Sequence, residues 1–323
     1  MDRVVTDARK FSVGTLDENR LAPPRDDIVK TPTNICTDYG KFIERGYQNG
    51  NLSYERKGSD PGKLIIFNYE FVNTKKYRAG SRRDVLEIIT VFQRLGFNIY
   101  MEDIHTDLSS KEVMTVLDEV VTSDLSQSNS LILFFLTHGN EQNFLETTDG
   151  EILVEDIYNK FSTCKDLKNK PKMFVFQACK GSGKTTTTGY EIESSIVPAN
   201  IFKNHIPPDT LLLFSSIEGN VSYRTAYGSW FIQELCKNFH VYGRRDDVTS
   251  LVTRTIKCVC GNYYYHDEGE DMYVKQMPLM VSTLKRKFYL NTNKERHILI
   301  KISEDLEKIK IKLKNMELNK NIQ

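Results

Sequence analysis

The amino-acid sequence predicts an α/β protein in which helices cover both faces of a largely parallel β-sheet. From Lys63 onward, short apolar runs such as LIIFNYEF and LILFFL alternate with stretches that repeat apolar residues at helical spacing. The connections between these stretches are short. Strands that alternate with helices in this way are typical of parallel sheets, because each helix carries the chain back along the sheet.

The expected elements follow from the period of their apolar residues. Short continuous apolar runs predict buried strands, and a period near 3.6 predicts amphipathic helices, as at Val85, Ile88 and Phe92. We expect strands at residues 64–71, 97–101, 130–136, 172–176, 210–216 and 285–290. We expect helices around residues 85–95, 110–121, 154–161, 229–239 and 248–259, and an aromatic and acidic loop, YYYHDEGEDMY, at residues 263–273.

Changes in composition divide the chain into segments. Residues 1–62 are polar and contain proline, glycine and asparagine clusters, which predicts a flexible leader. Residues 181–209 are small, polar and interrupted by prolines, which predicts an exposed linker between a large structured segment, 63–180, and a small one, 210–290.

The last segment, residues 291–323, has the spacing of a helical extension. Its apolar residues stand at 299, 302, 306, 309, 313 and 316, at alternating spacings of three and four positions. Such a helix either packs on itself or on a partner, or it is a solvated and weakly helical extension.

Composition excludes several classes of protein. The chain has 44 Lys and Arg against 43 Asp and Glu, so no overall field attracts it to nucleic acid or to an anionic membrane. The N-terminus has no apolar signal region, and no apolar run is long enough to span a bilayer, which favours a cytoplasmic protein. Six scattered cysteines predict free thiols, and Cys258 and Cys260 lack a second ligand pair at a zinc spacing. We therefore expect no metal and no cofactor.

Polar residues follow two of the predicted strands at the point where each strand ends. His138 and Gly139 follow LILFFL, and Cys179 follows MFVFQ. Ligands bind beyond the carboxyl ends of parallel strands, so His138 and Cys179 meet there if the two strands are neighbours. A thiolate can attack a carbonyl while an imidazolium protonates the leaving amine, which is the chemistry of a cysteine protease. The backbone N–H groups of Gly139 and Cys179 are candidates for holding the oxyanion.

Four motifs resemble those of the caspase family. LTHG at 136–139 and QACKG at 177–181 resemble the two active-site signatures of that family. SYR at 222–224, followed by GSWF, is similar to its substrate-binding stretch, and YRAG at 77–80 occupies the place of its first specificity arginine. The resemblance implies a caspase-like fold with a six-stranded, mostly parallel sheet, and a cysteine endopeptidase that cuts proteins after aspartate.

The resemblance also implies a cationic substrate pocket. Arg78 and Arg224, with the amide of Gln177, would form a cup that grips a carboxylate in two places. Further substrate-binding positions implied by the resemblance are Ser222, Tyr223 and Trp230.

Two residues depart from the usual family pattern. Lys180 follows the nucleophile, where Arg, Gln or Gly is usual, and Thr137 stands where serine is common. Neither change removes a catalytic group. Lysine lacks the planar fork of arginine, so we expect looser anchoring of the loop at Lys180.

The family resemblance carries further expectations about assembly and activation. It implies an active homodimer of large and small segment pairs, joined near residues 285–290, with a role in apoptosis. The leader is too short for a recruitment domain, which favours an executioner type with upstream initiator caspases and inhibitor-of-apoptosis proteins as partners. Because residues 180–208 contain no aspartate, we expect processing after Glu193.

Two other classes of protein are weighed against this interpretation. Ala178 to Thr185 nearly matches a phosphate-binding P-loop with alanine in place of its first glycine, but the β-branched TTTTG that follows does not favour the helix such a loop requires. A non-catalytic scaffold with the same fold is the other alternative, and the presence of both His138 and Cys179 argues against it.

Overall fold

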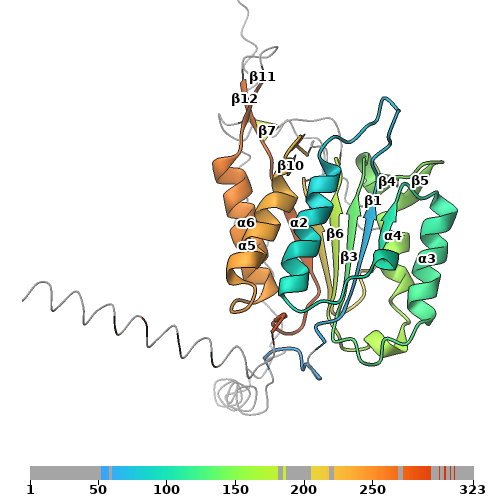
Figure 1. Cartoon of the computed structure of the whole chain (residues 1–323), viewed down its shortest axis with the longest axis vertical. Helices are drawn as coiled ribbons and strands as arrows, with labels where there is room; N and C mark the ends of the chain where they lie inside the picture. The colour runs from blue at the N-terminus through green and yellow to red at the C-terminus, as the bar shows by residue number, and fades with distance from the viewer. Residues whose placement is uncertain are drawn as a thin grey trace, which may run out of the picture. The chain divides into compact units, whose positions relative to one another are not determined.

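The computed structural model describes residues 52–57, 60–180, 185–186, 205–217, 222–267 and 272–291, together with Ile298, Ile302, Leu306 and Ile309. Six strands form one sheet in the order β13-β8-β6-β3-β1-β2 (Figure 1). All neighbouring strands in it run parallel except β13, which is antiparallel to β8. The predicted mostly parallel six-stranded sheet is therefore confirmed. The strands are β1 (Lys63–Asn68), β2 (Ile104–Thr106), β3 (Leu131–Leu136), β6 (Lys172–Gln177), β8 (Thr210–Phe214) and β13 (Leu279–Ser282).

Helices cover both faces of the sheet, as predicted (Figure 1). Alternate residues of a strand point to opposite faces, so Leu64 and Ile66 of β1 enter one core while Ile65 and Phe67 enter the other. Because both faces are covered, the central strands are continuous apolar runs. The first core includes residues of α2 (Ser81–Arg94), α5 (Trp230–Tyr242) and α6 (Val248–Asn262), and the second those of α3 (Ser110–Thr122) and α4 (Val154–Lys160).

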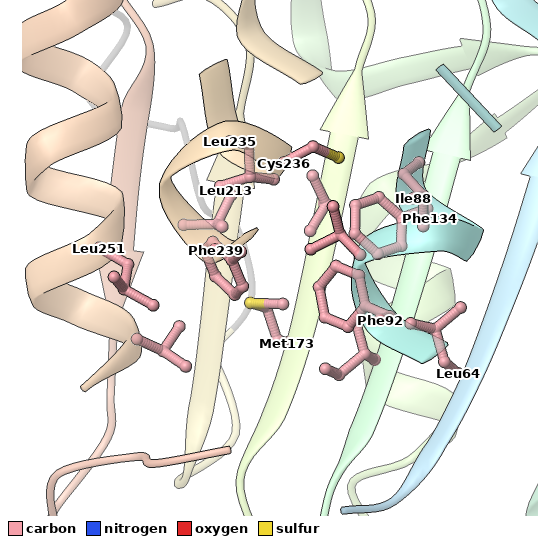
Figure 2. Close-up of a cluster of buried hydrophobic side chains, with 14 of the residues drawn as sticks. Leu64, Ile88, Phe92, Phe134, Met173, Leu213, Leu235, Cys236, Phe239 and Leu251 are labelled. Atoms are coloured by element: carbon pink, nitrogen blue, oxygen red, sulfur yellow. The ribbon is translucent and has the colours of Figure 1, made fainter. Parts of the chain in front are cut away.

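The first core joins the two predicted segments of the chain, as Figure 2 shows. The ring of Phe92 in α2 lies 5.5 Å from that of Phe134 in β3 and 5.5 Å from that of Phe239 in α5. Met173 of β6 and Leu213 of β8 are fully buried beside them. Since α5 and β8 follow the linker and the other elements precede it, the large and small segments share one hydrophobic core.

In the second core, a row of stacked aromatic rings crosses the sheet. Phe67, Phe135, Phe176 and Phe214 are register partners on β1, β3, β6 and β8. Their successive ring centroids lie 4.5, 5.8 and 5.2 Å apart. A shift of one residue would move a ring to the other face, so this row specifies the register of the four strands. It thereby aligns their carboxyl ends.

The strand predicted at residues 97–101 is wrong, and the edge strand β2 comes after it. Gly96, with φ of +94°, ends the α2 turn, and Phe97 is buried. Tyr100 and Met101 instead point to solvent and begin a short 3₁₀ turn, in which the Tyr100 N–H donates to Asp103 at 3.0 Å. The apolar run is therefore not a strand, because the backbone at its end turns, with Asp103 N–H donating to the Tyr100 carbonyl at 3.1 Å.

The strand predicted at residues 285–290 is also wrong. The sixth strand is β13, and Lys287 makes only an isolated bridge with Ser53. Backbone groups of this stretch bond to other segments: the Lys287 carbonyl accepts from Tyr54 N–H, and the Phe288 carbonyl from Val248 N–H at the start of α6. The side chains of Phe288 and Leu290 are buried, which explains the apolar pattern without a sheet partner.

Two small hairpins were absent from the prediction. The expected loop at residues 263–273 contains β11 (Tyr265–Asp267) and β12 (Met272–Lys275), which pair with each other, and β12 also pairs with β7 (Thr185–Thr186). The other hairpin joins β4 (Phe144–Glu146) to β5 (Glu151–Leu153). Its turn carries Asp-Gly at 149–150, a hairpin signal that the sequence offered.

Part of the predicted leader packs against the small segment. Tyr54 is buried, and its hydroxyl donates to Asp209 at 2.8 Å. Lys285 pairs with the same carboxylate at 3.2 Å. Contacts with the core thus begin before Lys63, while residues 1–51, 58 and 59 of the leader lie outside the described part of the chain. Among the described residues, no helix combines the length and apolar character needed to cross a bilayer.

Candidate active site

The register of β3 and β6 brings the two proposed catalytic residues to the same edge of the sheet. Leu136 is the partner of Gln177, and Thr137 N–H donates to the Gln177 carbonyl at 3.1 Å. His138 and Cys179 are each the second residue past this last pair. The two side chains therefore leave neighbouring strands at the same level, and both are partly exposed.

The ring of His138 is held from two directions. Its Nε2 donates to the backbone carbonyl of Lys76 at 2.8 Å, and its ring stacks on Phe71 with centroids 5.6 Å apart. The bond to Lys76 leaves Nδ1 as the acceptor nitrogen of the neutral ring. Burial lowers the pKa of His138, and the charges of Arg78 and Arg224 lower it further, so the ring is neutral at pH 7.

The thiol of Cys179 contacts the small segment. Its Sγ lies 3.8 Å from the Ser222 carbonyl and 3.4 Å from the Ser222 backbone nitrogen. Gly139 lies against the same turn, since a Cβ at this position would stand 2.7 Å from the Cys179 carbonyl oxygen and 3.0 Å from Ala178 Cβ. Only glycine allows the backbone after His138 to approach Cys179 this closely.

Arg78 is a buried cation with unused donors. It is 1% exposed, and its Nη1 donates to the carbonyls of Tyr69 and Leu136 at 2.6 Å each. Its Nε and Nη2 have no hydrogen-bond partner among the described residues. Buried donors without partners are costly, so these N–H groups favour an acceptor supplied by a ligand.

Arg224 and Gln177, the other predicted members of the cup, are each held by one hydrogen bond. Arg224 Nε donates to the Ala79 carbonyl at 2.9 Å, which connects the loop after β1 to β9 (Arg224–Thr225) in the small segment. Gln177 Nε2 donates to Ser222 Oγ at 2.7 Å, and its buried Oε1 has no partner in the described chain.

The electrostatics of the cup favour an anion. Burial, and next the charge of Arg224, lower the pKa of Arg78 to about 9. Burial also lowers the pKa of Arg224, against the attraction of Asp84. The Asp84 carboxylate itself accepts from Ser229 N–H at 2.9 Å and from Gln233 at 2.9 Å. Both guanidinium groups thus lose hydration, and among the described residues neither has a directly bonded carboxylate. An incoming carboxylate would stabilise their charged forms.

Tyr223 and Trp230 lie together next to this cup. Their rings stack at 4.7 Å, and Tyr263 lies 5.3 Å from the Trp230 ring. Tyr223 N–H donates to Gln276, whose own amide donates to the Ser215 carbonyl beyond β8. The Tyr223 backbone is therefore tied to the sheet, and the partly exposed rings form an apolar wall.

Lys180 is anchored differently from a surface lysine. It is 4% exposed, and its Nζ lies 3.8 Å from the centroid of the Phe214 ring. A cation over an aromatic face is attracted by the ring quadrupole, so the ring supplies part of the anchoring expected of an arginine. The burial of Lys180 and its contact with Phe214 argue against the loosely anchored loop that we expected at this position.

Several residues around the site had no signal in the sequence. Phe71 and Lys76 hold His138, Asp84 supports the loop of the small segment through Ser229, and Gln276 ties Tyr223. Phe71 belonged to a predicted strand but lies in the loop that follows β1. The predicted processing residue Glu193 lies outside the described residues. No three metal-binding side chains cluster within the described ranges.

The nucleotide-binding alternative is wrong. A P-loop requires a helix at residues 184–185, whose N-terminal amides face the phosphates. The described residues Thr185–Thr186 form strand β7, which pairs antiparallel with β12.

Known proteins of similar sequence share one domain. Residues 62–289 match the caspase domain. The chain is 29% identical to chicken caspase-7 over 251 residues, which cover 74% of this chain and 79% of the relative. It is 29% identical to Xenopus laevis caspase-3, covering 77% and 87% of the two chains, and 28% identical to Drosophila melanogaster caspase drICE, covering 72% and 70%.

A solved structure shares the fold. The crystal structure of caspase-1 from Spodoptera frugiperda superposes with a TM-score of 0.65 at 26% identity, covering 75% of this chain and 94% of that one. With the match over residues 62–289, this similarity leads to one conclusion: the chain belongs to the caspase domain family of proteases.

Proposed function

We propose that this protein is a cysteine endopeptidase that cleaves protein substrates after aspartate, with Cys179 as nucleophile and His138 as its proton-transfer partner. The observation that carries the proposal is the buried guanidinium of Arg78, whose Nε and Nη2 lack partners within the described chain, next to Arg224 and close to Cys179.

The reaction follows from the two side chains. Nδ1 of His138 accepts the proton of the Cys179 thiol while the sulfur bonds to the scissile carbonyl carbon. The imidazolium then gives this proton to the leaving amine as the C–N bond breaks, which leaves a thioester that water hydrolyses. Backbone N–H groups of Gly139 and Cys179 stabilise the oxyanion of the tetrahedral intermediate.

Specificity for aspartate rests on the cationic cup. A substrate carboxylate accepts from Arg78 and Arg224, and a half-turn of the Gln177 amide offers it a further N–H. Ser222 offers backbone groups to the peptide, while Tyr223 and Trp230 take an apolar residue next to the aspartate.

Turnover of matched peptides tests this function. Peptides with Asp at the cut position are cleaved, and Glu peptides are slower by about 10- to 200-fold, because one extra methylene must fit. Asn peptides are slower by on the order of 10⁴-fold, because the buried cations stay unpaired. Equal kcat/KM values for Asp and Asn peptides would contradict the proposed pocket.

The biological setting that fits this activity is execution of apoptosis in the cytoplasm. The curated relatives named caspase-3, caspase-7 and drICE support this role. We place the protein as a homodimer of large and small segment pairs, with initiator caspases upstream and inhibitor-of-apoptosis proteins as further partners.

A further inference from the structure

A groove lies between helices α2 and α5, which pack side by side on one face of the sheet (Figure 1). Its volume is about 470 Å³, and ligand sites in proteins commonly have about 300–1,000 Å³. Helix α2 contributes Glu87, Thr90 and Val91 to the lining, α5 contributes residues from 233–241, and Tyr263 follows α6. The groove contains none of the residues assigned above to catalysis or to the cationic cup.

Glu234 brings a buried carboxylate to this groove. It is 3% exposed, and its Oε1 accepts from the Tyr263 hydroxyl at 2.9 Å and from Lys237 Nζ at 3.1 Å. Its Oε2 is buried and has no hydrogen-bond partner among the described residues. A buried carboxylate oxygen without a donor is costly, so this atom favours a donor supplied by a ligand.

Glu87 and His240, which also line the groove, already have partners. Glu87 pairs with Arg83 at 3.0 Å, and Arg94 Nη1 donates to His240 Nε2 at 2.6 Å. The buried oxygen of Glu234 is therefore the acceptor of this lining that neither solvent nor a described side chain supplies with a donor.

The donor that suits a single carboxylate oxygen is an ammonium group. A guanidinium presents a planar fork that matches two acceptors side by side, whereas an ammonium binds as a point charge. Within the described ranges no three metal-binding side chains converge, which favours an organic cation over a metal ion. Val241, 59% exposed in the same lining, offers apolar surface to a carbon stem. The Lys237 side chain is 68% exposed, so it can move aside as a ligand enters.

We propose that the groove between α2 and α5 binds a primary ammonium group carried on an apolar stem, with Glu234 as its acceptor. A free alkylamine and a lysine side chain of another protein present this same group. The site is independent of the proposed protease function, because its binding is measured without turnover.

Calorimetric titration of the full chain with butylamine tests the site. Butylamine binds with saturable heat, whereas butanol, which has the same stem and no charge, does not. In Glu234→Gln the amide oxygen keeps the bonds to Lys237 and Tyr263 while the amide nitrogen replaces Oε2, so the affinity falls by about tenfold or more. Glu119→Gln, an exposed position on α3, removes the same charge elsewhere and leaves the affinity unchanged. No saturable heat, or equal affinity in Glu234→Gln and the unaltered chain, would overturn the proposal.

A second pair of variants tests the groove without changing a buried residue. Val241→Lys places an ammonium of the chain itself at the groove, which weakens butylamine binding by about tenfold because like charges repel. Met101→Lys is the matched control, since Met101 is 81% exposed and lies outside the lining. Unchanged thermal transitions verify that both variants are folded. Equal affinities of the two variants would overturn the proposal.

The single tryptophan of the chain, Trp230, gives a local signal for the same titration. Its ring lies 5.3 Å from that of Tyr263, which lines the groove. Butylamine changes the Trp230 emission along the same binding curve as the heat, and Glu234→Gln abolishes this change. An emission change that persists in Glu234→Gln would place the amine elsewhere and overturn the proposal.

Two further probes distinguish the sources of the ammonium. N-acetyl-lysine amide presents a lysine side chain, and its side-chain-acetylated form lacks the charge. If the lysine amide binds as tightly as butylamine, the site accepts a lysine of another protein, and if only butylamine binds, the site takes a free amine. Equal binding of the lysine amide and its acetylated form would overturn the proposal.

Discussion

His138 is held by groups from two parts of the chain, the loop after β1 and strand β4. Its ring contacts Phe71 and the Lys76 carbonyl from the loop after β1, while its own carbonyl accepts from Glu146 N–H at 2.9 Å. The Lys76 and Glu146 side chains meet in an ion pair of 2.8 Å, which closes the loop and the β4–β5 hairpin around the histidine. This arrangement fixes the ring orientation with Nδ1 as the proton acceptor.

The lowered pKa of His138 predicts the pH dependence of activity. The neutral ring is the active form, so the acidic limb of kcat/KM lies below the ordinary value of 6.5. Glu146 raises the pKa of His138, so Glu146→Gln shifts this limb to still lower pH. Measured pH profiles check both statements, with the exposed Glu102→Gln as a control that leaves the limb unchanged. An acidic limb above 6.5 in the unaltered protein would count against His138 as the base.

Sequence located the catalytic candidates but not the groups that hold them. His138 and Cys179 each follow a buried strand, and this position is readable from the apolar runs. Lys76 acts through a backbone carbonyl, which every residue type has, and it stands 62 positions before His138. The unused donors of Arg78 were equally hidden, since burial of an arginine depends on the packing of several distant segments.

The carboxyl ends of β3 and β6 place the site, and Gly139 determines how closely they meet. A side chain at this position would collide with the Cys179 backbone rather than with a movable side chain. The turn after β3 would then have to shift away from the nucleophile.

Gly139→Ala is therefore expected to lower kcat/KM by about 100-fold or more, because small displacements of reacting groups cost this much. Circular dichroism of the variant should still report the α/β fold, since the core is untouched. Gly150→Ala in the neighbouring hairpin is the matched control, because its added Cβ would meet only Ser110 Oγ at 3.6 Å. Equal losses in the two variants would contradict the close approach inferred for Gly139.

Long elements with a clear period were predictable, and short ones were not. The helices and the four central strands bury a continuous face, which leaves a pattern in the sequence. Strand β13 has only four residues, all partly or fully exposed, and it is defined by its pairing with β8. Residues 285–290 end in Phe-Tyr-Leu, but their backbone bonds to Tyr54 and the start of α6, which local sequence does not reveal.

The large and small segments pack into one folded body, although the predicted linker separates them in the sequence. They share the core around Phe92 and Phe239, and the Ala79 carbonyl binds Arg224 across the site. The first aspartate after Cys179 is Asp209, which is 2% exposed and bonded to Tyr54 and Lys285. A protease could not reach the bond after Asp209 without opening this part of the fold.

We therefore propose that processing occurs after Glu193, by the enzyme itself or by an initiator caspase that tolerates glutamate. One extra methylene costs about 1–3 kcal/mol, so cleavage is slow but physically accessible. Mass spectrometry of the purified protein is expected to find a small segment that begins at Ser194. Two outcomes would contradict this site: a cut near Lys184, or a fully active single chain that stays intact when Glu191 and Glu193 are changed to alanine.

The central claim is that Cys179 attacks the carbonyl that follows an aspartate side chain, with His138 as its partner. The most direct measurement uses a peptide electrophile with aspartate next to its reactive carbon, and locates the adduct by peptide mass mapping. We predict one adduct, on Cys179, whose rate of formation falls by roughly 100-fold or more in His138→Ala and with the asparagine form of the reagent. Labelling spread over the six cysteines, or an unchanged rate without His138, would contradict the claim.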